Sequence, residues 1–304
     1  MSVEIPYRRD FAFAYGALEK VTPLVRRIVA RNPGPFTFRG TGTYVVGRGK
    51  VAIIDPGPDI EEHVDALLGD LRGETVTHIV VTHTHLDHSP AAAAVKARTG
   101  APTYGYGPHA GGRDGAVVEA GGDYDFVPDV VVADGDVIEG DGWHLEAVHT
   151  PGHTSNHLCF GFPEERILFS GDHVMGWSTS VIAPPDGDMA DYMRSLERLL
   201  AREDGVYWPT HGPSIPQPHE HVRAFIAHRR EREAGIIDCL KAGCETIDSL
   251  VERLYVALNP ALKGAAGRSV LAHLIDLIGR DIVAADGPAT IAAHYRLRHV
   301  GRSG

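Results

Sequence analysis

Residues 77–88 read THIVVTHTHLDH, and this stretch decides how the chain is interpreted. The β-branched run at 79–81 predicts a buried strand. If the extended geometry continues, His83 and His85 point to the same side, because side chains along a strand alternate. Asp87 and His88 then lie in the turn before the next helix and point elsewhere. The pattern predicts a site for two metal ions, one at each pair.

Three further ligand-type residues follow apolar runs later in the chain. His153 lies in TPGHT, Asp172 in LFSGD and His211 in PTHGP. Each has Gly or Pro close by, which is typical of a strand that ends in a loop, where scaffolds present functional side chains. Imidazoles and carboxylates suit zinc, with iron and manganese as alternatives.

Composition excludes several classes of protein. The 304 residues hold 40 Asp and Glu against 29 Lys and Arg, a net charge of −11, which argues against a uniformly basic nucleic-acid binder. No apolar run approaches the ~18 residues of a membrane span. The N-terminus lacks an apolar signal segment, and three cysteines are too few for a disulfide framework. We therefore expect a cytoplasmic protein without a membrane partner.

The texture of the chain changes near residue 222. Residues 1–222 alternate strand-like runs with helices expected at 60–71, 89–100 and 189–204, which favours a layered α+β domain. Residues 223–304 carry 12 Lys and Arg against 9 Asp and Glu, a net charge of +3. Here we expect helices at 219–243, 246–258 and 269–282. The sequence predicts two domains, 1–222 and 223–304.

The motifs HTHLDH, TPGHT, SGD and THG, in this order, resemble the metallo-β-lactamase fold superfamily over about residues 25–215. The resemblance implies a four-layer αββα sandwich with two divalent metal ions at one edge. It implies that His83, His85 and His153 bind the first ion, and that Asp87, His88 and His211 bind the second. Asp172 would bridge the two ions.

No cysteine stands at a ligand position, so the set is similar to the glyoxalase II type. This implies a hydrolase in which a metal-bridging hydroxide attacks a small ester, thioester or lactone. Such an ion lowers the pKa of its bound water to about 7. Asp87 is the candidate catalytic residue, because it could orient or deprotonate this water as well as bind an ion.

Five neighbouring residues are candidates for supporting roles. Asp55, in DPGP, is a turn residue or the partner of a ligand histidine. His157, four residues after His153, either reaches the substrate or holds a loop. The stretch 174–188 has little periodicity and predicts a long loop after Asp172, in which Trp177, Ser178 and Thr179 are candidates to line the substrate pocket.

Residues 226–300 are similar to the small helical, winged-helix-like domain of the β-lactamase-like protein 2 branch. Some members of that branch cleave single-stranded RNA, so an RNA phosphodiesterase is the alternative activity, and RNA an alternative partner to a small molecule. A nucleic-acid-binding regulator is an alternative of another class, although the C-terminal helices carry few basic residues. A homo-oligomer is compatible with the sequence.

Overall fold

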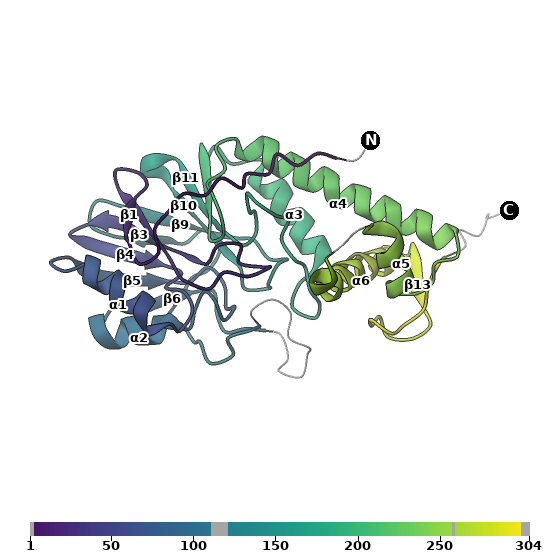
Figure 1. The fold of residues 1–304 in the computed structure, drawn as a ribbon, viewed down its shortest axis with the longest axis horizontal. Helices are drawn as coiled ribbons and strands as arrows, with labels where there is room; N and C mark the ends of the chain where they lie inside the picture. Colours follow the sequence, from purple (N-terminus) through teal and green to yellow (C-terminus); the bar gives the residue numbers. More distant parts are fainter. Residues whose placement is uncertain (1–2, 111–120, 257–258, 299–304) are drawn as a thin grey trace.

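The computed structural model describes residues 3–110, 121–256 and 259–298 (Figure 1). Two mixed sheets form the larger part of the molecule. The first sheet has seven strands in chain order: β1 (Glu19–Lys20), β2 (Val25–Val29), β3 (Gly42–Arg48), β4 (Lys50–Ile54), β5 (Thr75–Val80), β6 (Thr103–Gly105) and β7 (Val130–Val131). The second follows the order β12 (Val206–Pro209), β11 (Ile167–Gly171), β10 (Leu158–Phe162), β9 (His144–His149) and β8 (Val137–Glu139).

Alternation along the strands produces the layers. On β3, Tyr44 and Val46 face the second sheet and pack against residues such as Phe160, whereas Val45 faces the opposite side. There it meets helices α1 (Glu61–Asp70) and α2 (Ala91–Thr99), through residues such as Leu67. The first sheet therefore buries both of its faces, one on helices and one on the other sheet.

The outer face of the second sheet is covered by α3 (Met189–Leu199) and by the first half of α4 (Pro218–Lys241). Tyr192 and Leu196 of α3 join this core, as the helical spacing of apolar residues in that segment indicates. The arrangement is the expected αββα sandwich, and the chain as a whole is α+β.

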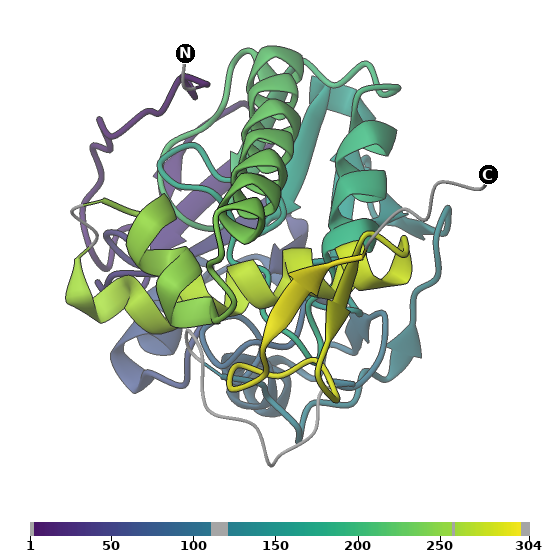
Figure 2. The ribbon, with the colours of Figure 1, turned by 90° about the vertical axis from the view of Figure 1, so that its right-hand side faces the viewer.

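The C-terminal part packs around its own core (Figure 2). It contains the second half of α4, α5 (Ile247–Leu254), the short 3-10 turn η2 (Pro260–Leu262), α6 (Lys263–Gly279) and a hairpin of β13 (Val283–Ala285) with β14 (Tyr295–Leu297). Another 3-10 turn, η1 (Pro163–Glu165), lies between β10 and β11 in the larger part of the molecule. The sequence predicted only helices in this region. It did not predict the hairpin, because strands of three residues are too short to show a pattern. The final two residues of the helix expected at 246–258 lie outside the described residues.

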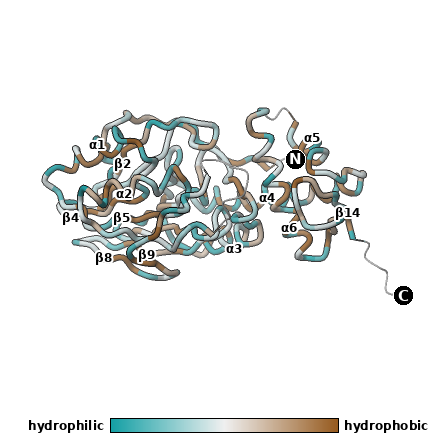
Figure 3. The backbone as a smooth tube through the Cα atoms, turned by 90° about the horizontal axis from the view of Figure 1, so that it is seen from below, coloured by the Kyte–Doolittle hydropathy of each residue, from teal (hydrophilic) through white to brown (hydrophobic). Residues whose placement is uncertain are grey.

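Helix α4 connects the two parts of the molecule (Figures 1 and 3). Its Val222 and Phe225 belong to the core beside the second sheet, whereas Ile236 and Leu240 belong to the C-terminal core. The expected boundary at 222/223 falls inside this continuous helix, and the division into 1–222 and 223–304 stays a prediction. Within the described residues, no helix is both long and apolar enough to cross a bilayer.

Candidate metal centre

The ligand-type residues follow strands that run in one direction. Strands β4 and β5 are parallel, as are β11 and β12, and β9 runs parallel to β11 because both are antiparallel to β10. The carboxyl ends of these strands therefore meet at one edge of the sandwich. Backbone hydrogen bonds join the two sheets there, from Leu158 to Thr82 and from Gly42 to Thr210, both 2.8 Å.

Three histidines form the first cluster, which we call the triple-histidine cluster: His83, His85 and His153. The Nδ1 atom of His85 lies 3.1 Å from Nε2 of His83 and 3.2 Å from Nε2 of His153. Burial, together with the neighbouring histidines, lowers the pKa of His83 and of His85 well below the ordinary value. Three ring nitrogens directed at one another suit a shared cation.

A second cluster, the aspartate–histidine cluster, contains Asp87, His88 and His211. The carboxylate of Asp87 lies 3.2 Å from Nε2 of His211 and 3.5 Å from Nε2 of His88. Asp172 stands between the clusters, with its Oδ2 atom 3.2 Å from Nε2 of His211 and 3.9 Å from Nε2 of His153. All seven predicted ligands are thus brought together, and Asp172 contacts both groups.

The carboxylates control the charge of the aspartate–histidine cluster. Although burial alone would lower it, Asp172 and Asp87 raise the pKa of His211 to about 10. Burial alone would also lower the pKa of His88. The same two carboxylates outweigh it and raise this pKa well above the ordinary value. Burial alone would raise the pKa of Asp172, but the two imidazoles outweigh it and hold that pKa well below its ordinary range. The two carboxylates thus favour positive charge at His88 and His211, which is the charge that a bound cation would supply.

Four of the histidines have their tautomer fixed by an acceptor at Nδ1. Nδ1 of His153 donates to the carbonyl of Val181, and Nδ1 of His211 donates to the carbonyl of Gly40. Nδ1 of His83 donates to Oγ1 of Thr82, and this hydroxyl in turn donates a hydrogen bond to Asp55. Asp55 itself is the acceptor for His88. With an ion bound in place of a proton, each Nε2 would therefore present its lone pair to the clusters.

Asp55 is bonded to His88, one of the predicted ligand histidines. It is fully buried, and its carboxylate accepts from Nδ1 of His88 at 3.0 Å, from the amide and hydroxyl of Thr82 at 2.8 Å and from the hydroxyl of Thr210 at 3.1 Å. Its φ of 48° is unusual for a residue other than glycine. This strained turn fixes the ring orientation of His88.

His157 holds the backbone of Asp172. Its Nε2 accepts from the amide of Asp172 at 3.2 Å, so Nδ1 carries the proton and donates to the hydroxyl of Thr150 at 2.9 Å. Burial, reinforced by His173 and His153, lowers the pKa of His157 well below the ordinary value, which keeps the ring neutral. These bonds fit the second of the two roles expected of His157, which is to hold a loop.

Orphaned atoms in the clusters fit bound cations. Nε2 of His88 and Oδ1 of Asp172 are buried and have no hydrogen-bond partner among the described residues. Buried polar atoms without partners are costly and rare. A donor set of imidazole nitrogen and carboxylate oxygen suits Zn²⁺ and other divalent transition metals. The residues present therefore fit a pair of divalent ions.

Two glycines of the motifs are required by close approaches. Gly152, in TPGHT, has a φ of 136°, and a Cβ there would lie 2.3 Å from Cα of Tyr192. Gly171, in SGD, has a φ of 50°, and a Cβ there would lie 2.5 Å from Nε2 of His157. Any side chain at these positions would displace the neighbours of His153 and Asp172.

The loop at 174–188, as predicted, has no helix or strand. The ring of Trp177 stacks on Phe38 with centroids 4.9 Å apart and lies against Gly212, next to His211. Trp177, Ser178 and Thr179 line a cavity of about 360 Å³ between the loop, α4 and α6, which we call the interdomain cavity. The three candidates thus line a cavity beside the metal centre rather than the clusters themselves.

Sequence reasoning missed His109. Its Nδ1 atom is bonded to the hydroxyl of Thr84 at 3.0 Å, and its ring centroid lies 6.0 Å from that of His85. Asn156 donates to the same hydroxyl at 2.8 Å. Only the Gly- and Pro-rich context YGPHAGG could have drawn attention to His109, because no strand pattern precedes it directly.

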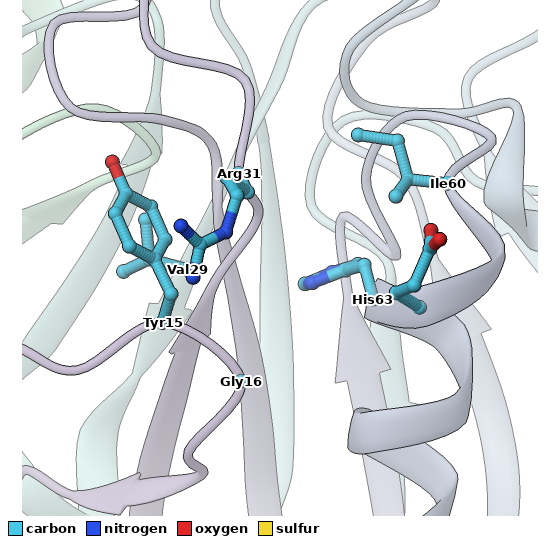
Figure 4. A pocket seen from close by; sticks show the side chains of 7 residues that line it. Tyr15, Gly16, Val29, Arg31, Ile60 and His63 are labelled. Carbon is cyan, nitrogen blue, oxygen red and sulfur yellow. The ribbon is translucent and has the colours of Figure 1, made fainter.

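A second cavity, of about 510 Å³, lies between the N-terminal segment and α1 (Figure 4). Arg31 and His63 face it from opposite sides, and Tyr15 forms part of the wall near Arg31. Nε2 of His63 is bonded to Thr43 at 3.0 Å, and burial lowers the pKa of His63 to about 4. Among the described residues that line this cavity there is no member of either cluster.

Comparison with family models adds two matches. Residues 37–211 match the model described as the metallo-beta-lactamase superfamily, and residues 246–289 match the beta-lactamase associated winged helix domain. The first match contains every residue of the two clusters together with Asp172. The second contains α5, α6 and β13.

Curated relatives and solved structures are similar to the chain over most of its length. A beta-lactamase-like protein 2 homolog of Caenorhabditis elegans is 34% identical over 74% of this chain and 73% of its own. The atrochrysone carboxyl ACP thioesterase of Claviceps purpurea is 30% identical over 78% and 74%. A crystal structure of a metallo-beta-lactamase family protein from Thermus thermophilus superposes with a TM-score of 0.75 at 22% identity, covering 92% of this chain and all of that one, which shows a shared fold.

Proposed function

This chain belongs to the metallo-β-lactamase superfamily and is a hydrolase of that superfamily, and from this premise we propose that it uses two divalent ions, zinc in the first place, to hydrolyse a small thioester. Esters and lactones are the related substrates. The observation that carries the proposal is the convergence of two nitrogen- and oxygen-rich clusters on Asp172.

The triple-histidine cluster and Asp172 would hold one ion, and the aspartate–histidine cluster and Asp172 the other. When bound, the ions would supply a water whose pKa is lowered to about 7 and would polarise the substrate carbonyl. The chain itself supplies orientation: Asp55 fixes the ring of His88, and His157 fixes the backbone of Asp172.

Asp87 has a second role in this proposal. Its Oδ2 atom accepts from the hydroxyl of Thr41 at 3.1 Å and faces His211 at 3.2 Å. Because the neighbouring imidazoles of His88 and His211 keep the pKa of its carboxyl low against the effect of burial, Asp87 is ionised at neutral pH. It can therefore accept a hydrogen bond from the attacking water and orient it.

The thioester preference rests on a relative and on chemistry. The fungal relative carries a thioesterase name. A thiolate, with an ordinary pKa near 8.5, leaves without a general acid, and neither cluster offers a free acid for a poorer leaving group. RNA remains the alternative, against which the net charge of −14 of residues 1–222 argues.

The test combines metal analysis with a substrate panel. The purified protein should contain close to two equivalents of a divalent metal, and it should hydrolyse acyl thioesters faster than lactones, β-lactams, phosphodiesters or single-stranded RNA. Chelation should abolish the activity, and added Zn²⁺ should restore it. Thioester hydrolysis that survives chelation, or RNA cleavage as the fastest reaction, would overturn the proposal.

A further inference from the structure

The interdomain cavity has an unbalanced charge. Three arginines from two distant segments line it: Arg9 from the N-terminal segment, and Arg229 and Arg232 from α4. None of its described lining residues is an aspartate or a glutamate. In a chain with 40 acidic and 29 basic residues, a cavity lined by three cations without a carboxylate is a local reversal of charge.

The contacts of two of these arginines orient them without neutralising them. Arg229 is only 4% exposed, donates to the carbonyl of Ser180 and lies 5.2 Å from the ring centroid of Tyr192. Arg232 donates to the carbonyl of Leu254 at 2.9 Å and lies 4.5 Å from the ring centroid of Tyr255. Within the described residues, neither arginine has a carboxylate partner within ion-pair distance.

Two buried donors in the wall also lack an acceptor. Nε of Arg229 and Nε1 of Trp177 have no hydrogen-bond partner among the described residues. Both atoms can only donate. A buried donor without an acceptor is costly, and an oxygen-rich group in the cavity would remove part of that cost.

The same loop forms a wall of the cavity and of the metal centre. The carbonyl of Val181 accepts from His153 at 2.7 Å, and the hydroxyl of Ser180 donates to the carbonyl of Asp172 at 2.5 Å. Both residues line the cavity as well. The wall of the cavity thus includes residues that are bonded directly to His153 and Asp172.

We propose that the interdomain cavity binds an anionic group, a carboxylate or a phosphate, of an acyl thioester whose carbonyl reacts at the metal centre. This rests on the proposed function and names the substrate class: thioesters with a negative charge remote from the reacting carbon. The aromatic rings of Trp177 and Tyr255 would cover the apolar stretch between the two ends.

Three thioesters that differ in one group test the proposal on the full-length, metal-loaded protein. Pentanoyl pantetheine is neutral, pentanoyl 4′-phosphopantetheine carries a phosphate on the thiol side, and glutaryl pantetheine carries a carboxylate on the acyl side. We expect at least one charged substrate to exceed the neutral one in kcat/KM by about tenfold, mainly through KM, because charge-assisted hydrogen bonds are the strong ones. The better of the two identifies the source of the anion.

Arginine variants show whether the preference comes from the cavity. Arg232→Gln should reduce the ratio of kcat/KM between charged and neutral substrates to about threefold or less, and Arg229→Lys should retain more of it than Arg229→Met. Arg223→Gln is the matched control, since Arg223 lies exposed on the same helix and does not line the cavity. Arg232 is only partly buried, so its variant still reports if Arg229→Met fails to fold.

The outcomes separate the two proposals. Equal kcat/KM for all three thioesters would overturn the anion site and leave the hydrolase intact. If no thioester is hydrolysed, the proposed function fails, and calorimetric titration of the metal-free protein with 4′-phosphopantetheine, pantetheine and glutarate decides the anion site alone. Binding of neither anion more tightly than pantetheine, or equal loss of binding in Arg223→Gln, would overturn it.

Discussion

The metal centre and the interdomain cavity share residues of the loop at 174–188, yet they are built differently. The metal centre takes its side chains from strand ends that one sandwich edge brings together, and four ligand-type residues come from positions 83–88. The cavity takes its cations from the N-terminal segment and from α4. Dense local motifs thus mark the reaction site, whereas the site proposed for the substrate's charge depends on how the two parts of the molecule pack.

The largest expected effect is at the residue shared by the two clusters. Asp172→Ala should lower kcat by a factor on the order of 10³ or more, because it removes a ligand from both proposed ions. Metal content should fall in parallel. Asp141→Ala, on an exposed residue remote from the clusters, is the control. Full activity in Asp172→Ala would break the assignment of the centre.

Phe225 tests how firmly α4, which lines the cavity, packs on the sandwich that carries the metal centre. It is fully buried where α4 meets the second sheet, so Phe225→Ala should lower the free energy of unfolding by about 3–5 kcal/mol. Denaturant unfolding measured by circular dichroism would show this, with Arg223→Ala expected to stay within about 0.5 kcal/mol of the parent. A small loss at Phe225 would indicate that α4 docks weakly on the sandwich.

A change at Asp55 tests the orientation of the His88 ring without removing any of the predicted metal ligands. Asp55→Asn keeps the shape but removes the negative charge that accepts from His88, so metal affinity should fall by about 10- to 100-fold while binding remains measurable. Competition with a chromogenic chelator measures the change. Asp59→Asn, on the exposed residue four positions later, should have the parent affinity. An unchanged affinity in Asp55→Asn would show that the hydrogen bond to His88 is dispensable.

The last prediction concerns the pH dependence of stability at the cavity. Burial, together with Arg229 and Arg232, lowers the pKa of His228 to about 3, below the ordinary value of about 6.5 in the unfolded chain. The unfolded state therefore binds more protons between these values. The contribution of His228 to stability is complete above about pH 6.5 and is lost as the pH falls toward about 3.

His228→Gln should accordingly reduce the slope of unfolding free energy against pH in that window, by up to about 1.4 kcal/mol per pH unit. Urea unfolding at a series of pH values from about 4 to about 7 measures the slope. His294→Gln, on an exposed residue of the C-terminal part, is the surface control. A slope equal to that of the parent would place His228 in contact with solvent.

Much of the fold could be predicted from local patterns. The helices expected at 60–71 and 89–100 appear as α1 and α2, since apolar spacing and the punctuation by Pro90 and Gly100 act locally. The last long helix begins at Lys263 rather than Ser269, because its first turns bury small residues, Ala265 and Ala266, that give little periodic signal. The hairpin β13–β14 escaped prediction because its strands are too short to show a period.

The sequence by itself determined the superfamily, the fold class and the set of ligand-type residues, because strand alternation and ordered motifs are local features that are visible in the sequence itself. Only the tertiary structure decided that His157 holds Asp172, that Asp55 orients His88 and that His109 lies beside His85. It also decided that arginines 220 residues apart in the sequence, Arg9 and Arg229, line one cavity. The physical reason is that these contacts depend on how sheets and helices pack, which no spacing along the chain encodes.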